Sequence, residues 1–189
     1  MNSKNLFKVS LVAISLSFAA CNNANKTTNS EQDQENHVHD NSHEEHEHAE
    51  AGTNVPSFSD EKVGNVYHHY IHLKDALTKA DDNEAKKAAG ELENALSVVN
   101  NAEIANQAKL IKEASDLETR RSYLDKLSNQ LVDYFTANKP NSGVIYVQNC
   151  PMANNDAGGV WLSNEKQVSN PYYGDNMLKC GTNVSEIKM

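Results

Sequence analysis

The sequence lacks the motifs on which most enzyme mechanisms depend. Its 189 residues contain no G-x-S-x-G, no phosphate-binding loop, no paired catalytic carboxylates and no zinc-protease motif. Each of these motifs holds a nucleophile, a phosphate-binding backbone or an activated water at a fixed spacing. We therefore expect a protein that is not an enzyme.

Basic residues are scarce. The chain has 17 lysines and arginines against 26 aspartates and glutamates, a formal net charge of −9 at pH 7. An acidic surface repels nucleic acid and anionic lipid, so neither is expected as the main partner. The charge fits cation binding or simple solubility.

The apolar run LVAISLSFAA, residues 11–20, is too short to span a bilayer. It follows Lys4 and Lys8 and precedes Cys21, which is the order of a bacterial secretion signal with a small-residue cleavage site. The segment FAAC resembles a lipobox, in which Cys21 becomes the lipid-modified first residue of the mature protein. The alternative is an ordinary signal that is cleaved without lipidation.

A signal peptide over residues 1–20 predicts that the mature protein lies in the bacterial cell envelope. Lipid on Cys21 would anchor it to a membrane, and we expect this to be the outer membrane. Asn22 and Asn23 stand where an acidic run would signal surface export, so we expect the protein to face the periplasm. Cysteines can oxidise in that compartment. With Cys21 assigned to lipid, Cys150 and Cys180 remain as a pair.

Residues 21–58 contain almost nothing apolar to bury, which predicts a disordered tether between the anchor and a folded part. Imidazole binds zinc, copper and nickel, and a flexible chain can bring several imidazoles onto one ion. The alternative is a polar linker whose histidines bind nothing. The five tether histidines are His37, His39, His43, His46 and His48.

Apolar residues recur at helical spacing in four segments, residues 61–80, 81–101, 104–114 and 116–138. Asp81 or Asp82 and Asp116 are suited to cap the second and fourth segments. Short connections between four helices predict an antiparallel four-helix bundle. The apolar faces carry no Glu-x-x-His pair, so a di-iron site in the bundle is not expected.

Three histidines, His68, His69 and His72, fall opposite the apolar face of the first predicted helix. We expect them to face solvent. His68 and His72 are four residues apart and can share a metal ion, although two exposed histidines on one helix can also bind nothing.

The pattern changes after residue 142. The run GVIYVQN, residues 143–149, predicts a strand, and Trp161–Leu162 and Cys180–Ile187 predict two more, separated by glycine and proline turns. Trp161, Tyr172 and Tyr173 are expected to anchor a small core. The fold class is therefore mainly α, with a small irregular β unit at the C-terminus of a domain over residues 59–189.

The β unit contains two thiols and two thioethers. Such a soft ligand set prefers Cu(I) or another soft heavy metal. A disulfide between the two cysteines is the competing interpretation, with both methionines as ordinary packing; buried free thiols are a third. The four candidate ligands are Cys150, Met152, Met177 and Cys180.

The strand positions allow a geometric prediction. If the strands next to Cys150 and Cys180 pair as antiparallel neighbours, the two cysteines lie close enough for a disulfide or a shared ion. We therefore expect their sulfur atoms to be neighbours, with Met152 or Met177 beside them. Lys179 is the only nearby cation that could favour a thiolate.

Four motifs of the sequence resemble the bacterial domain of unknown function family 3347. They are YIHLKDAL (residues 70–77), YVQNCPMA (146–153), WLSNEKQVSNPYYG (161–174) and MLKCG (177–181). The resemblance extends over residues 59–188. It implies an exported or lipid-anchored protein, and similar domains are attached to periplasmic adaptor subunits of heavy-metal efflux pumps. By association it implies metal handling, with a metal ion and an efflux adaptor as partners.

The Cys-Pro-Met segment that begins at Cys150 also resembles short heavy-metal-binding segments of such adaptors. Those segments continue with His-Pro and end in Cys-Gly-Met. This chain has Ala153 and Asn154 instead of His-Pro, and no methionine after Gly181. The ligand set implied by the resemblance is therefore only partly present.

Overall fold

The computed structural model describes residues 55–189. The predicted signal peptide, the predicted lipidation site Cys21 and the five histidines of the predicted tether, His37, His39, His43, His46 and His48, lie outside the described residues. None of the described helices is long and apolar enough to cross a membrane.

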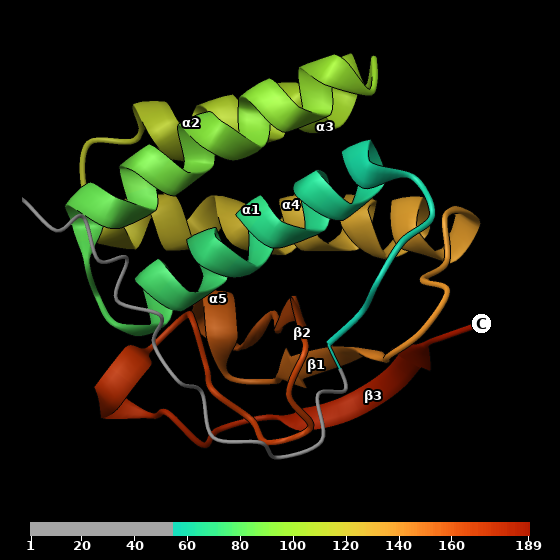
Figure 1. Ribbon diagram of the computed structural model, residues 1–189. Coiled ribbons are helices and arrows are strands. Elements are labelled where there is room, and N and C mark those ends of the chain that lie inside the picture. Colours follow the sequence, from blue (N-terminus) through green and yellow to red (C-terminus); the bar gives the residue numbers. More distant parts are fainter. Residues whose placement is uncertain (1–54) are drawn as a thin grey trace, which may run out of the picture. The chain divides into compact units, whose positions relative to one another are not determined.

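The described chain is mainly helical and ends in a small antiparallel sheet, as the sequence predicts (Figure 1). Four long helices come first, and short elements alternate with three strands after them. The elements are α1 (Glu61–Thr78), α2 (Asp82–Val98), α3 (Ala102–Glu113), α4 (Leu117–Ala137), β1 (Ile145–Cys150), α5 (Ala153–Asp156), β2 (Gly159–Ser163), η1 (Gly174–Asn176) and β3 (Thr182–Ile187).

Each long helix begins at a side chain that satisfies a free backbone N–H group. Asp81 accepts a hydrogen bond from the N–H of Glu84 at 3.0 Å, and Asp116 accepts one from Thr119 at 2.8 Å. Asp60 and Asn101 cap α1 and α3 in the same way. The prediction that aspartates cap the second and fourth helices is confirmed, because oxygen side chains at these positions replace the missing intrahelical partners.

The apolar faces of the helices meet in one core. The alanines and leucines of α2 that face inward are completely buried, as are Leu124, Leu127 and Leu131 of α4. α1 and α4 lie next to the strands, and α2 and α3 lie on the side of α1 and α4 that faces away from the strands (Figure 1). The core therefore runs from the helices into the sheet.

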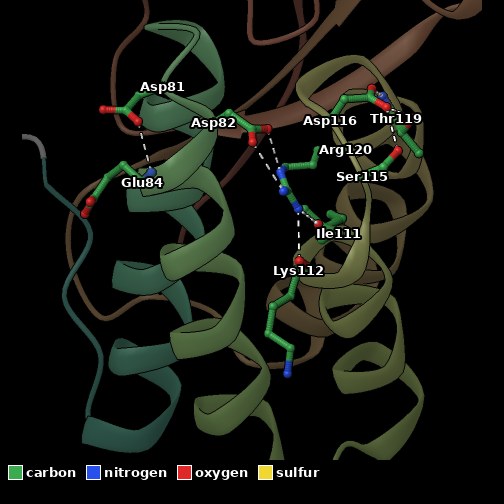
Figure 2. A network of polar contacts seen from close by, with 9 residues as sticks. All are labelled: Asp81, Asp82, Glu84, Ile111, Lys112, Ser115, Asp116, Thr119 and Arg120. Carbon is green, nitrogen blue, oxygen red and sulfur yellow. Dashed lines mark hydrogen bonds and ion pairs between the residues drawn. The ribbon is translucent and has the colours of Figure 1, made fainter. Parts of the chain in front are cut away.

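A buried arginine connects three of the helices. Arg120 of α4 is only 2% exposed, and its Nε donates to the Asp82 carboxylate of α2 at 2.8 Å (Figure 2). Its Nη1 donates to the carbonyl oxygens of Ile111 and Lys112 at 2.6 and 3.0 Å. These carbonyls lie in the last turn of α3, where no intrahelical partner is available. Arg120 thus satisfies the end of α3 while it pairs with α2.

The sheet has the strand order β2-β1-β3, and both pairs are antiparallel. Cys150 lies opposite Gly159 of β2, and Asn149 lies opposite Thr182 of β3. An irregularity between Val147 and Gln148 shifts the register toward β3. The three strands predicted from the sequence therefore form one sheet, with β1 in the centre.

Single hydrogen bonds connect the helices to the sheet. The hydroxyl of Tyr70, in α1, lies 2.8 Å from the Ser128 hydroxyl of α4 and accepts a 3.0 Å hydrogen bond from the N–H of Leu162 in β2. Asp125 of α4 accepts a hydrogen bond from the N–H of Val160 at 2.8 Å. Two backbone N–H groups of β2 are thus paired with side chains of α1 and α4 across the junction between the helices and the sheet.

The segment before α1 also contacts the folded domain. Ser57 forms an isolated bridge with Ser142, and the Phe58 ring lies 5.6 Å from the rings of both Tyr67 and Phe135. Ser57 and Phe58, which the sequence-based prediction assigned to the tether, therefore pack on the domain.

Candidate functional site

The two C-terminal cysteines lie side by side. Cys150 is the last residue of β1, and Cys180 lies two residues before β3, which pairs antiparallel with β1. Their Sγ atoms are 2.9 Å apart and both thiols are free. Cys150 is completely buried and Cys180 is partly exposed. The prediction that the two cysteines are neighbours is confirmed.

The surroundings of Cys180 favour its protonated thiol. The hydrogen bond with Cys150 raises the pKa of the Cys180 thiol, and burial and the charge of Cys150 add to this effect. Lys179 does not help, because its Nζ is directed to the carbonyl oxygen of Val168 at 3.3 Å. A metal ion that binds Cys180 must therefore displace the proton of its thiol.

The two methionines lie close to the cysteines in the sequence, and each accepts a hydrogen bond through its backbone carbonyl. The N–H of Cys180 donates to the carbonyl oxygen of Met177 at 2.9 Å, and the carbonyl oxygen of Met152 accepts a 2.5 Å hydrogen bond from the Tyr173 hydroxyl. The Met152 side chain is 46% exposed, and Met177 is partly buried. Coordination by the two thioethers stays a prediction.

Aromatic side chains pack beside the thiols. Trp161 is completely buried and its Nε1 donates to Gln148 Oε1 at 2.8 Å. The Tyr172 hydroxyl donates to the Val160 carbonyl at 2.7 Å, and burial raises the pKa of Tyr172. Trp161 and Tyr172 are also in edge contact. Their role as anchors of a small core agrees with the expectation from the sequence.

The chain between β1 and β2 makes an unusual turn that the sequence analysis missed. Three successive residues, Asn154, Asn155 and Asp156, adopt positive φ angles of 53°, 57° and 66°. Asparagine and aspartate tolerate the left-handed conformation better than other residues with a side chain, so the run Asn-Asn-Asp was the available signal. Strained backbone of this kind recurs at binding sites.

A pocket of about 300 Å³ lies against this turn. Arg121 lines it and donates an Nη2 hydrogen bond to the carbonyl oxygen of Leu77 at 2.7 Å, while its buried Nε has no partner. Burial lowers the pKa of the Arg121 guanidinium. The other lining residues are Glu118, Ser122, Asn154, Asn155, Tyr172 and Tyr173.

The histidines of α1 are placed differently from the prediction. His68 is exposed as expected, but His69 and His72 are only partly exposed and contact glutamates of α2. The expectation that all three face solvent is therefore confirmed for His68 and met only in part by His69 and His72. The helical wheel identifies the face away from the core, whereas α2 packs along the flank of α1 and covers part of that face.

Within residues 55–189, no three or more histidine, cysteine, aspartate and glutamate side chains already converge as they would around a bound metal ion. The thiol pair supplies two donors, and the tether histidines lie outside the described residues. The pair can bind a soft ion, form a disulfide, or remain as two thiols.

Residues 66–143 match the model of the family described as "Protein of unknown function (DUF3347)". The resemblance to family 3347 is therefore confirmed over this range, which includes the first of the four motifs, residues 70–77. The three motifs of the β unit lie beyond the matched residues. No curated protein and no solved structure matches the chain.

Proposed function

We propose that this chain, which carries a family 3347 domain over residues 66–143, is a lipid-anchored periplasmic protein that binds a soft heavy metal. Copper as Cu(I) is the expected ion, and the link is to metal efflux or homeostasis. The single observation that supports this proposal is the 2.9 Å separation of the Cys150 and Cys180 sulfur atoms. Met152, Met177 and the tether histidines are the further candidate ligands.

The thiol pair must rearrange to bind Cu(I). A linear two-thiolate site holds its sulfurs roughly 4.5 Å apart, twice a typical metal–sulfur bond. The observed 2.9 Å is shorter, so the sulfurs must separate on binding. Cys180 is partly exposed and can change rotamer, while Cys150 is buried and fixed at the end of β1. We therefore assign the movement to Cys180.

A competition titration tests the metal proposal. Cu(I) is added to the reduced full chain in the presence of a chromophoric Cu(I) chelator, in a background in which the five tether histidines are asparagine. We expect one tightly bound Cu(I) per chain, and loss of that ion in Cys150→Ser/Cys180→Ser. Equal Cu(I) affinity in the serine variant would overturn the proposal.

A second candidate function is a non-enzymatic interaction module stapled by a Cys150–Cys180 disulfide, which docks on an efflux adaptor or another envelope partner. The specific observation in its favour is that 2.9 Å is closer to a disulfide bond of about 2 Å than to the separation in a linear Cu(I) site. A bond across 30 residues stabilises the fold by roughly 3 to 4 kcal/mol in the chain-entropy model.

Thiol counting separates the two functions. Protein isolated from the periplasm without reductant is denatured and its thiols are counted. For a stapled module we expect no free thiol at Cys150 and Cys180 and a melting temperature that falls on reduction. Two free thiols, with a melting temperature that reductant does not change, would leave the metal-binding proposal in place and contradict the stapled module.

The anchor is testable on its own. Cys21→Ala is expected to release a soluble exported protein, detected in the soluble periplasmic fraction by immunoblot. Protease added to intact cells checks the orientation, since a periplasm-facing protein is protected. Rapid loss of the protein under that treatment would show surface display.

We further infer that α1 to α4 form the antiparallel four-helix bundle predicted from the sequence. Three residues, 79–81, join α1 to α2, and three residues each join α2 to α3 and α3 to α4. Consecutive helices also contact each other. Connections of this length favour reversal of chain direction between neighbours.

A further inference from the structure

The surface between α1 and α2 carries a cluster of two histidines and two glutamates that is separate from the thiols. Glu91 Oε2 lies 3.5 Å from His69 Nδ1 and 3.4 Å from His72 Nδ1. Glu84 Oε1 lies 2.8 Å from His72 Nε2. The four side chains are between 28% and 38% exposed, so the cluster is reachable from solvent.

The 2.8 Å contact with the Glu84 carboxylate favours, in a neutral His72 ring, the tautomer with the proton on Nε2. A carboxylate only accepts, so Nε2 of His72 carries the proton and its Nδ1 presents a lone pair toward Glu91. Glu91 is an acceptor as well, and 3.4 Å between two acceptors is not a hydrogen bond. A cation between these atoms would satisfy both of them.

The second imidazole has a similarly unsatisfied atom. Nδ1 of His69 is buried from solvent and has no hydrogen-bond partner. A pocket of about 300 Å³, lined by His69, Glu91, Lys62 and Asn65 among others, gives the ring room to turn.

We propose that His69, His72 and Glu91 bind a divalent ion of the zinc type, with Glu84 holding the His72 ring in place. Two imidazoles and one carboxylate are a typical ligand set for Zn²⁺, with water completing the coordination. A carboxylate that accepts a hydrogen bond from the other nitrogen of a metal-bound imidazole orients that ring and makes it a better ligand.

The distances fit this ion after a small rearrangement. Ligand atoms about 2.1 Å from a tetrahedral ion lie about 3.4 Å from one another. Glu91 Oε2 already has this separation from both imidazole nitrogens. The donors do not yet converge on one point, so binding requires the His69 ring to rotate toward His72. His69 and His72 are three residues apart on α1, which places them on one side of the helix.

This site is independent of the proposed function. It uses nitrogen and oxygen ligands, which suit borderline divalent ions, whereas the thiols suit Cu(I). The competing explanation is a structural one, in which protonated histidines pair with Glu84 and Glu91 and bind nothing. Lys87, which lies 3.2 Å from Glu84 Oε1, belongs to the same network in either case.

Cobalt(II) as a spectroscopic substitute for zinc gives the test. The full chain carries asparagine at the five tether histidines and serine at Cys150 and Cys180, which leaves only His68, His69 and His72 of the eight histidines. We expect one Co²⁺ per chain with visible ligand-field bands and no thiolate charge-transfer band, and displacement of Co²⁺ by Zn²⁺. If the serine background fails to fold by circular dichroism, the cysteines are retained and thiolate binding is recognised by its intense near-ultraviolet band.

Matched variants decide between the two explanations. His69→Asn and Glu91→Gln are each expected to weaken Co²⁺ and Zn²⁺ binding by about 10- to 100-fold, and Glu84→Gln by about 10-fold. His68→Asn removes an exposed neighbour on the same helix and is expected to leave binding unchanged. The proposal is overturned if the parent chain binds no Co²⁺, or if His68→Asn weakens binding as much as His69→Asn does. A parent-like affinity in Glu91→Gln also overturns it.

Discussion

The helical region and the C-terminal β unit of this protein are stabilised in different ways. The helices bury repeated small and branched apolar side chains, such as Ala88, Leu92 and Leu96 of α2, all of which are completely buried. The β unit also buries apolar side chains, such as Trp161 and Leu162, and its buried amides make several specific hydrogen bonds. Gln148, also completely buried, donates to the Glu165 carbonyl and accepts from Trp161.

Asn170 shows the same contrast in the loop that carries Cys180. It is completely buried, accepts a hydrogen bond from the N–H of Tyr172 and donates to the carbonyl oxygen of Cys180 at 2.9 Å. A buried amide of this kind satisfies backbone groups that have no strand or helix partner. The irregular segments of the β unit therefore depend on individual hydrogen bonds to buried amides in addition to apolar packing.

The largest loss of stability is expected from a substitution of Arg120, a buried polar side chain that connects three of the helices. Arg120→Met removes the buried guanidinium and leaves the carbonyls at the end of α3 without donors, which we expect to cost about 3 kcal/mol of unfolding free energy. Urea denaturation measures this. Lys109→Met, which breaks only an exposed pair with Glu113, is the control and should change stability by less than about 0.5 kcal/mol. Equal losses in both variants would contradict the role of Arg120.

A pair of glycine substitutions compares the two regions directly. Gly181 has a φ of 140°, and a Cβ there would lie 2.8 Å from the Trp161 ring and 2.9 Å from the Asn149 carbonyl oxygen. Gly181→Ala is expected to destabilise the β unit by about 2 kcal/mol and to speed the reaction of Cys150 with a thiol reagent.

Gly64 lies within α1, and a Cβ there meets only Phe58 at 3.8 Å. Gly64→Ala is therefore expected to stabilise the protein by about 0.5 to 1 kcal/mol, with no change in Cys150 reactivity. Thermal unfolding and a stopped-flow thiol assay measure both variants. A Gly181→Ala protein as stable as the parent would show that the β unit tolerates a shift of this turn.

A substitution at the junction between the helices and the sheet is expected to reduce the stability of the protein by a smaller amount. Tyr70→Phe removes the hydroxyl that pairs with Ser128 and accepts from the N–H of Leu162. Leaving these buried groups unpaired should cost about 1 to 2 kcal/mol. Hydrogen exchange of the Leu162 amide should accelerate more than exchange in α2. Uniform acceleration across the domain would argue that the loss is global instead of local.

The smallest expected effect on stability comes from Asp116, the cap of α4, and it appears only at acidic pH. The hydroxyl of Ser115 and the N–H of Thr119 lower the pKa of Asp116 to about 2, against an ordinary value of 3.8. The folded pKa is the lower of the two, so this contribution to stability is complete above about pH 4 and is lost as the pH falls toward 2. Ser115→Ala should raise the pKa of Asp116, as followed by its carboxyl carbon shift in NMR. An unchanged pKa in that variant would contradict the assigned cause.

Local sequence signals were sufficient for most of the helical region. The predicted segment 61–80 corresponds to α1 at Glu61–Thr78, and the fourth segment corresponds to α4. Apolar spacing and capping residues act within one or two turns, so they can be recognised without knowledge of the rest of the chain. The neighbouring sulfurs of Cys150 and Cys180 were also predicted, because antiparallel pairing of their strands fixes them.

The features that were missed depend on residues far apart in the sequence. His69 and His72 were placed in solvent because helical spacing identifies only the face away from the core. Contact with Glu91 arises only because α2 packs along the flank of α1. The pocket beside Arg121 likewise combines α4 with the left-handed turn at residues 154–156.

The sequence by itself determined the approximate positions of the four long helices and the three strands, and that the two regions differ in composition. Their periodicity, caps and turn residues act over short distances. Only the tertiary structure decided which side chains of different elements meet: Arg120 with Asp82, His72 with Glu84, and Tyr70 with Leu162. The physical reason is that such contacts follow from how packed faces align, a balance of many weak interactions that no single segment encodes.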